Sequence, residues 1–335
     1  MDFWIRLLTG CMAAAASIGI FMVSFSNQSD SSLLHVSFDA TREVLLEIAE
    51  AFKKEMRRQG QTVPTVIHSH GSSGSQARAV VAGLPADLVS LAIWPDLDTI
   101  VTQGSNEIVD KKWLETPSPW FTTMVFIVRK GNPKKISSWE DLDRPDVKVI
   151  IPNPKVSGNG KLAFLSLIGA LQANGKSNSD INSYLKNIFS RIPVLESSSR
   201  AATLTFATKG LGDVQITYES EAELVLKEGL GLEKVIPDVS IKAPLPLAPI
   251  NRKGQSTQQK QLAHKYIEYF SSEIAQEIIV KYGFRPTNPA VHNRHYSSFQ
   301  KPAKFFTVEE VSGSWLKANK ELFSQNGLFD RIMAP

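Results

Sequence analysis

Four clusters of small residues constrain the fold of this 335-residue chain more than any other feature. They lie at 38–43, 69–76, 153–161 and 196–203, and each follows a strand-like run and precedes a segment with helical character. A helix that begins at a small residue leaves backbone N–H groups free, and the positive end of its dipole lies at the same place. Because such an end attracts anions, four of them predict one oxyanion held by several helix starts.

The order of elements around the clusters predicts an α/β fold. Apolar runs indicate strands at 33–38, 63–69 and 87–93, with helices at 42–57 and 75–83 between them. This β-α-β-α-β order implies a mostly parallel sheet flanked by helices.

The rest of the chain repeats this design. Strands at 122–129, 148–151 and 212–218 alternate with helices at 161–173, 203–209 and 219–228. A long amphipathic helix is expected at 257–281, and the segments 307–310 and 312–322 predict a final helix.

Composition agrees with a two-domain globular protein. Hydrophobic residues make up 42% of the chain and charged residues 21%, and the length suffices for two domains. The formal net charge of +4 suits an anionic ligand. Lys and Arg are scattered and form no dense run with interleaved aromatics, so nucleic acid is not expected as a partner.

The N-terminus predicts export. Residues 3–25 are apolar apart from Arg6 and lead into a polar spacer, which is typical of a secretory signal peptide over 1–26. The alternative is an uncleaved membrane anchor, since about 19 apolar residues nearly span a bilayer. Cys11, the only cysteine, ends a lipoprotein-like box, but most of the apolar run follows it, so lipidation is the less favoured reading.

Other chemistries fit the clusters less well. Ser73 beside His70 raises the alternative of a serine hydrolase, but a Gly-x-Ser-x-Gly elbow would need glycine at 75, where Ser75 stands. His68 and His70 have no third ligand nearby in the sequence, so no metal is expected. The 157–160 run lacks the spacing of a nucleotide phosphate loop and fits a simple anion nest, and no cofactor is expected.

Four side chains near the clusters each have a structural and a functional interpretation. Asp39 and Arg42 stand at the first helix start, where Asp39 can cap the helix. A buried Arg200 must be paired, either with the anion or with a carboxylate such as Asp39. Tyr218 ends a strand, where its hydroxyl can reach a cleft or its ring can simply be half-buried.

Five longer motifs occur together in one order. They are Ser-Phe-Asp-Ala-Thr-Arg-Glu (37–43), Ser-His-Gly-Ser-Ser-Gly-Ser-Gln-Ala-Arg (69–78), Val-Arg-Lys-Gly-Asn-Pro-Lys (128–134), Ile-Pro-Asn-Pro-Lys-Val-Ser-Gly-Asn-Gly (151–160) and Gly-Leu-Gly-Asp-Val-Gln-Ile-Thr-Tyr-Glu-Ser-Glu-Ala (210–222). Together they resemble the periplasmic sulfate-binding protein family, the receptors of sulfate/thiosulfate ABC importers. The resemblance runs from about residue 33 to about residue 331.

The resemblance implies a type II periplasmic binding protein with two lobes and its ligand in the cleft. The first lobe would comprise 33–121 and 244–331 and the second 122–243, with hinge strands near 122–129 and 243–250. It further implies a monomeric periplasmic receptor, not an enzyme, that delivers sulfate or thiosulfate to permease subunits in the inner membrane.

The resemblance also assigns the site. The dianion would be held without a contacting counter-charge, and Arg200, Arg42 and His70 would stand behind the contacting residues. The donors would be the backbone N–H groups of five residues, one serine hydroxyl and one side chain in place of the family's indole: Asp39, Ser73, Gly158, Asn159 and Ser199, then Ser157, then Tyr218.

Three of these positions depart from the family pattern. Asn159 replaces a glycine, Ser199 an alanine and Tyr218 a tryptophan. The first two keep their backbone N–H groups, whereas the tyrosine changes the donor itself. Molybdate receptors also place a tyrosine in their site, which keeps molybdate or tungstate as an alternative ligand.

Hydrogen-bond chemistry bears on the choice of ligand. A fully ionised oxyanion only accepts hydrogen bonds, whereas protonated phosphate brings a hydroxyl that needs an acceptor. In a site made of donors that hydroxyl stays unpaired at a cost of about 1–3 kcal/mol. The sequence therefore favours sulfate over phosphate, provided that the Asp39 carboxylate points away from the ligand.

Overall fold

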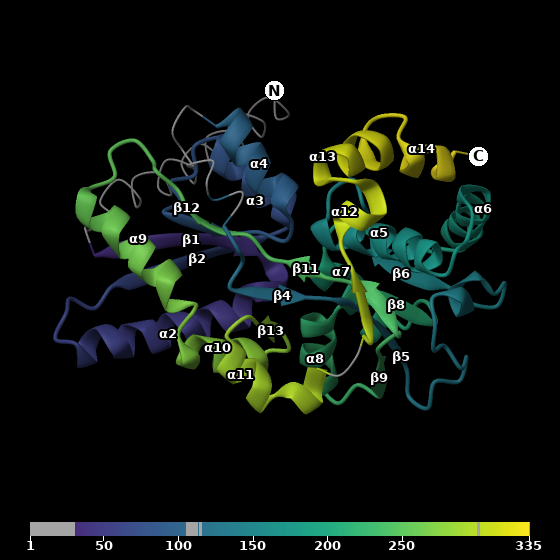
Figure 1. The fold of residues 1–335 in the computed structure, drawn as a ribbon, viewed down its shortest axis with the longest axis horizontal. Coiled ribbons are helices and arrows are strands. Elements are labelled where there is room, and N and C mark those ends of the chain that lie inside the picture. Colours follow the sequence, from purple (N-terminus) through teal and green to yellow (C-terminus); the bar gives the residue numbers. More distant parts are fainter. Residues whose placement is uncertain (1–30, 105–112, 114–115, 300–301, 335) are drawn as a thin grey trace, which may run out of the picture.

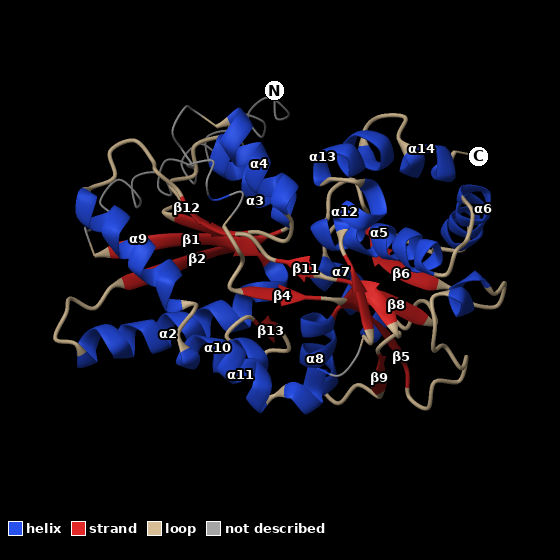
Figure 2. Ribbon diagram, in the orientation of Figure 1, coloured by secondary structure: helices blue, strands red, loops and turns tan. Residues whose placement is uncertain are grey.

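The computed structural model describes residues 31–104, 113, 116–299 and 302–334, which fold into two lobes, each with a sheet flanked by helices (Figures 1 and 2). This confirms the predicted two-lobed α/β fold. The segment expected to be a signal peptide or anchor at 1–26, with Cys11, lies outside the described residues. Within the described ranges, no helix has both the length and the apolar character needed to cross a membrane.

The first lobe is built on a four-stranded sheet in the order β12-β3-β1-β2. Its strands are β1 (Ser32–Phe38), β2 (Thr65–Gly71), β3 (Leu88–Ser90) and β12 (Leu247–Pro249). β1 is parallel to β2 and β3, while β12 is antiparallel to β3. Every residue of β1 is buried, because helices cover both faces of this sheet.

The helices of the first lobe follow its strands, and those at 42–58 and 73–81 lie close to the positions predicted for them. They are η1 (Asp39–Thr41) with α2 (Arg42–Arg58), α3 (Ser73–Val81) and α4 (Trp94–Gln103), joined later in the chain by α9 (Thr257–Tyr269) and α10 (Glu273–Lys281). Leu45, Ile48 and Phe52 of α2 are buried in the core, in agreement with the apolar spacing of that segment. α4 was not predicted.

The second lobe is built on a five-stranded sheet in the order β7-β6-β8-β5-β9. Its strands are β5 (Met124–Arg129), β6 (Val149–Pro152), β7 (Leu195–Glu196), β8 (Val214–Tyr218) and β9 (Leu232–Val235). β6 is parallel to β7 and β8, but β5 is antiparallel to β8 and β9. Four of the five strands therefore run in one direction, as expected of a mostly parallel sheet, and β5 alone runs opposite, because it enters directly from the crossing between the lobes.

Four helices and a short turn surround the second sheet. They are η3 (Glu140–Asp143), α5 (Gly158–Ala173), α6 (Asn178–Phe189), α7 (Ser199–Ala207) and α8 (Glu219–Lys227). α5 is buried along most of its length, which suits its run of Leu, Ala, Phe and Ile. α6, which was not predicted, begins with a capping box between Ser177 and Asp180.

A small three-stranded sheet joins the lobes. β4 (Trp120–Thr122) pairs antiparallel with β11 (Ala243–Pro244) and with β13 (Arg285–Pro286). β4 leads into β5 after one residue, and β11 leads into β12, so the two crossings lie where the hinge strands were predicted. β13 is a third, unpredicted strand at this junction.

The C-terminal part differs from the single long helix predicted at 257–281. The chain turns at 270–272, where Phe270 is fully buried and the Ser272 hydroxyl accepts from the Ala275 N–H to cap α10. A serine N-cap starts a new helix even where the apolar periodicity continues. The expected final helix is likewise divided into several short ones.

The last elements cover the second lobe (Figure 1). β10 (Val239–Ile241) pairs with β14 (Lys304–Phe306), α12 packs against α5, and α14 packs against α6. The remaining short helices are α11 (Pro289–Arg294), η4 (Tyr296–Phe299), α12 (Val308–Ser312), α13 (Trp315–Ala318), η5 (Asn319–Phe323) and α14 (Leu328–Met333).

Candidate functional site

A small cavity between the lobes brings together the seven residues that the sequence analysis singled out. Its volume is about 10 Å³, which is about the space that one water molecule needs. The lining residues come from both lobes and are Phe38, Asp39, Ser72, Ser73, Ala92, Ser157, Gly158, Asn159, Ser198, Ser199 and Tyr218.

Four helix starts meet at this cavity. Because β1 and β2 are parallel and Phe38 is in register with Gly71, η1 and α3 begin side by side at the same edge of the first sheet. The second lobe contributes the starts of α5 at Gly158 and α7 at Ser199. The first N–H groups of a helix have no partner inside it, so each of these starts brings the positive end of a helix dipole to the cavity.

Glycine at 158 permits the two lobes to touch. A Cβ added to Gly158 would lie 2.7 Å from the Ala92 Cβ and 3.5 Å from side-chain atoms of Ile93, both in the first lobe. Real Cβ atoms do not approach another carbon that closely. The absence of a side chain at this position therefore brings the start of α5 into direct contact with the first lobe.

The Ser157 hydroxyl caps α5, and its own proton remains available for a second hydrogen bond. Its oxygen accepts from the Gly160 N–H at 3.4 Å, and the side chain is 4% exposed. A hydroxyl that accepts one hydrogen bond can still donate its own proton. Ser157 can therefore cap α5 and donate to a ligand at the same time.

The hydroxyl of Ser73 is engaged elsewhere. It donates to Asp96 Oδ2 at 2.5 Å and accepts from the Ala92 N–H at 2.9 Å, while burial raises the pKa of Asp96. His70 instead shares a 2.7 Å hydrogen bond with Ser37. The structure thus does not pair Ser73 with His70, although Ser73 lines the cavity. Asp96 was missed, although its place after Pro95 at a helix start was a signal.

Arg200 is paired with carboxylates behind the cavity. It lies 3.3 Å from Glu43 of α2 and 2.8 Å from Glu221 of α8, neither of which the sequence analysis identified as a partner. Burial raises the pKa of Glu221 to about 7, and the Arg200 charge opposes this rise. The carboxylate alternative for Arg200 is correct, but the ion-pair partners are Glu43 and Glu221 rather than Asp39.

The Asp39 carboxyl faces the start of α7 across the cavity. Burial raises its pKa, whereas the Ser198 hydroxyl and the backbone N–H and charge of Arg200 lower it. Arg42 and His70 are not among the residues that line the cavity. Arg42 affects His70 through its charge, which adds to burial in lowering the pKa of His70 to about 4.

Tyr218 and Asn159 are part of the wall contributed by the second lobe. Tyr218 is fully buried, its ring meets Phe38 edge to face at 5.9 Å, and burial raises the pKa of its hydroxyl well above the ordinary value. Asn159 Nδ2 donates to Ser199 Oγ at 3.1 Å and to Thr217 Oγ1 at 3.4 Å. Thr217 has no counterpart in the sequence prediction, because its side chain meets Asn159 only in the fold.

Three histidines form a row across β1 and β2. The rings of His35 and His68 and those of His68 and His70 lie 5.5 Å apart, and burial lowers the pKa of His68 to about 4. In the described part of the chain, no three His, Cys, Asp or Glu side chains gather so that they could hold a metal ion.

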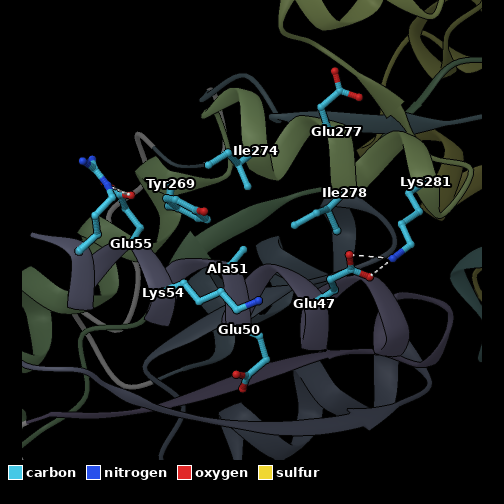
Figure 3. Close-up of a pocket in the computed structure, with 11 residues that line it drawn as sticks. Glu47, Glu50, Ala51, Lys54, Glu55, Tyr269, Ile274, Glu277, Ile278 and Lys281 are labelled. Carbon is cyan, nitrogen blue, oxygen red and sulfur yellow. Dashed lines mark hydrogen bonds and ion pairs between the residues drawn. The ribbon is translucent and has the colours of Figure 1, made fainter.

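A larger groove of about 640 Å³ lies elsewhere, between α2 and α10 (Figure 3). Ala51, Tyr269 and Ile278 line it, and Glu47 pairs with Lys281 at its rim at 2.6 Å. None of the predicted site residues lines this groove. The interlobe cavity is therefore the candidate site.

Comparison with known proteins agrees with this geometry. The sulfate-binding protein of Salmonella typhimurium is 38% identical over 311 residues, which cover 90% of this chain and 93% of that protein. The thiosulfate-binding protein of Pseudomonas aeruginosa is 36% identical over 309 residues, covering 90% and 92% respectively.

A solved structure and a family model also match this chain over most of its length. The sulfate-binding protein SubI of Mycobacterium tuberculosis superposes with a TM-score of 0.79 and 32% identity, covering 88% of this chain and all of that one. The model of the family described as bacterial extracellular solute-binding protein matches residues 34–285. This chain therefore belongs to the bacterial extracellular solute-binding protein family.

Proposed function

We propose that this protein is the periplasmic receptor of an ABC importer and that it binds sulfate in the interlobe cavity. The observation that carries the proposal is the convergence of four helix starts, two from each lobe, on a cavity whose lining contains no Lys or Arg. A fully ionised oxyanion suits such a site, because fixed N–H dipoles can replace its water without a counter-ion. The sulfate-binding relatives support the same choice.

Each proposed contact is a donor. The backbone N–H groups of five residues would hold the oxygens, and the Ser157 and Tyr218 hydroxyls would complete the shell; the five are Asp39, Ser73, Gly158, Asn159 and Ser199. The charged groups behind the cavity already have partners, since Arg200 is paired with Glu43 and Glu221. Arg200 therefore supports the helix starts without contacting the anion.

We further propose a transport cycle in which the lobes close on the anion by bending at β4 and β11 and then dock on permease subunits in the inner membrane. The protein would act as an exported monomer without catalytic activity. The lobe boundaries at 33–121 with 244–331 and at 122–243 remain a prediction. The contacts of α12 and α14 favour assigning the last residues to the second lobe instead.

Thiosulfate, molybdate and tungstate are the alternative ligands. A thiosulfate-binding relative covers nearly the whole chain, and Tyr218 is the kind of residue that molybdate receptors use. The substrate-binding domain of a putative molybdenum transporter from Clostridium difficile has a TM-score of 0.54 but only 19% identity, so it shows the fold alone.

Titration calorimetry with sulfate, thiosulfate, molybdate, tungstate and phosphate tests the proposal. Losing one hydrogen bond to a charged ligand costs about 1.5–3 kcal/mol, so Ser157→Ala and Tyr218→Phe should each weaken sulfate binding by about 10- to 150-fold. Tyr296→Phe is a matched control, because Tyr296 is 61% exposed and does not line the cavity. Wild-type sulfate affinity in both cavity variants would refute the site assignment.

A further inference from the structure

The Asn159 side chain has hydrogen-bonding capacity that the donor shell does not use. It is 2% exposed, and its Nδ2 donates to Ser199 Oγ and Thr217 Oγ1. Its Oδ1 is buried and has no hydrogen-bond partner among the described residues. A buried acceptor without a partner costs about 1–3 kcal/mol, so a group that donates to it would add to affinity.

The neighbours of Asn159 allow its amide two orientations. The hydroxyls of Ser199 and Thr217 lie 3.4 Å apart, and each can either donate or accept. With Nδ2 on the hydroxyls, Oδ1 is left as an acceptor. With the amide reversed, the hydroxyls donate to Oδ1 and Nδ2 becomes one more donor. The same side chain can therefore meet a ligand oxygen with or without a proton.

Tyr218 has the same double capacity. Its hydroxyl is buried at the cavity and has no hydrogen-bond partner in the described ranges. A tyrosine hydroxyl can donate to an anion oxygen and can also accept a hydrogen bond, whereas the indole N–H that it replaces in the family pattern only donates. Besides the Asp39 carboxyl, which already accepts from the Ser198 hydroxyl and the Arg200 backbone N–H, two groups at the cavity can thus accept a hydrogen bond from a protonated ligand oxygen.

We propose that Asn159, assisted by Tyr218, lets this cavity bind singly protonated tetrahedral oxyanions, namely hydrogen phosphate and hydrogen arsenate, in addition to fully ionised ones. This inference rests on the proposed oxyanion function. In a site of donors alone, the ligand hydroxyl stays unpaired, and here the Asn159 amide turns Oδ1 toward it. The Ser199 and Thr217 hydroxyls accept from Nδ2 in one orientation of the amide and donate to Oδ1 in the other, so no buried group loses its partner.

The test compares sulfate with phosphate by calorimetry at about pH 8, where phosphate retains one proton. The quantity of interest is the ratio of the phosphate Kd to the sulfate Kd in wild type, Asn159→Gly and Asn159→Ala. Both variants keep the backbone N–H and remove only the amide. We expect this ratio to rise by about 5- to 150-fold in both variants, because the ligand hydroxyl loses its acceptor.

Asn182→Gly is the matched control for introducing glycine into a helix. Asn182 is an exposed residue of α6 and does not line the cavity, so its replacement should leave the ratio unchanged. A wild type that binds sulfate but not phosphate, or an unchanged ratio in both Asn159 variants, would overturn the inference. Failure of the wild type to bind any of these anions would instead overturn the proposed function.

Discussion

Replacing Gly158 by alanine tests whether contact between the lobes is required for binding. The new Cβ would lie 2.7 Å from the Ala92 Cβ, whereas carbon atoms in contact normally lie about 3.5–4.0 Å apart. Gly158 belongs to the second lobe and Ala92 to the first, so the overlap exists only when the lobes meet. To relieve it, the lobes must separate by roughly 1 Å or the start of α5 must shift.

The expected cost follows from overpacking. Inserting one methyl group into a filled space costs about 1–3 kcal/mol, which corresponds to roughly 5- to 150-fold weaker sulfate binding. The free energy of unfolding should change little, because the methyl group fits when the lobes are apart and alanine has a higher helix propensity than glycine. Calorimetry with sulfate measures the change in affinity, and urea unfolding without ligand measures the change in the free energy of unfolding.

Gly74→Ala is the matched control for this experiment. Gly74 also lies in the first turn of a helix at the cleft, but an added Cβ would meet its nearest neighbours at 3.4 Å or more. Those are ordinary contacts, so its sulfate affinity should stay within about twofold of wild type. The reasoning is refuted if Gly158→Ala binds as tightly as Gly74→Ala, or if it loses affinity only in proportion to lost stability.

Three further predictions concern stability. Burial lowers the pKa values of His68 and His70 to about 4, so between about pH 6.5 and 4 the unfolded chain binds more protons than the folded one. The unfolding free energy should therefore fall with decreasing pH in this window, by at most about 1.4 kcal/mol per pH unit for each histidine, and a flat urea midpoint would contradict this. Arg285→Ala removes the 2.7 Å ion pair of the buried Glu219 and leaves it Lys234 at 3.6 Å, so it should lower the unfolding free energy by up to about 3–5 kcal/mol, which an unchanged midpoint would disprove. Ser177→Ala removes the N-cap of α6 and should cost about 1 kcal/mol in the same assay.

The sequence predicted helix starts better than helix ends or strand directions. Small residues mark a start locally, which is why α3 and α5 begin close to the predicted positions. The break between α9 and α10 was missed because the apolar spacing continues through it, and only Ser272 signals the new start. Strand direction has no local signature, so the antiparallel placement of β5 could not be read from its residues.

In the site, too, features set by local sequence were predictable, whereas contacts between distant residues were not. The helix starts around the cavity were predictable because small residues mark them locally, as at Ser73 and Gly158. The supporting side chains were not, because their contacts depend on the fold: Arg200 meets Glu43 across 157 positions of the sequence. The orientation of Asn159 likewise depends on Thr217 of a separate strand, which no spacing rule relates to it.

The Arg200–Glu43 pair gives one more prediction, about how long the ligand stays bound. Glu43 lies on α2 of the first lobe and Arg200 on α7 of the second, 3.3 Å apart, with side chains 30% and 29% exposed. A partly exposed pair contributes about 0.2–1 kcal/mol, so Glu43→Gln should speed sulfate release by about 1.5- to 5-fold. Salt should narrow this difference between wild type and variant, because it screens the pair. Glu47→Gln is the control, since Glu47 pairs with Lys281 inside the first lobe. Equal release rates for wild type and Glu43→Gln at low salt in stopped-flow experiments would show that this pair does not hold the lobes together.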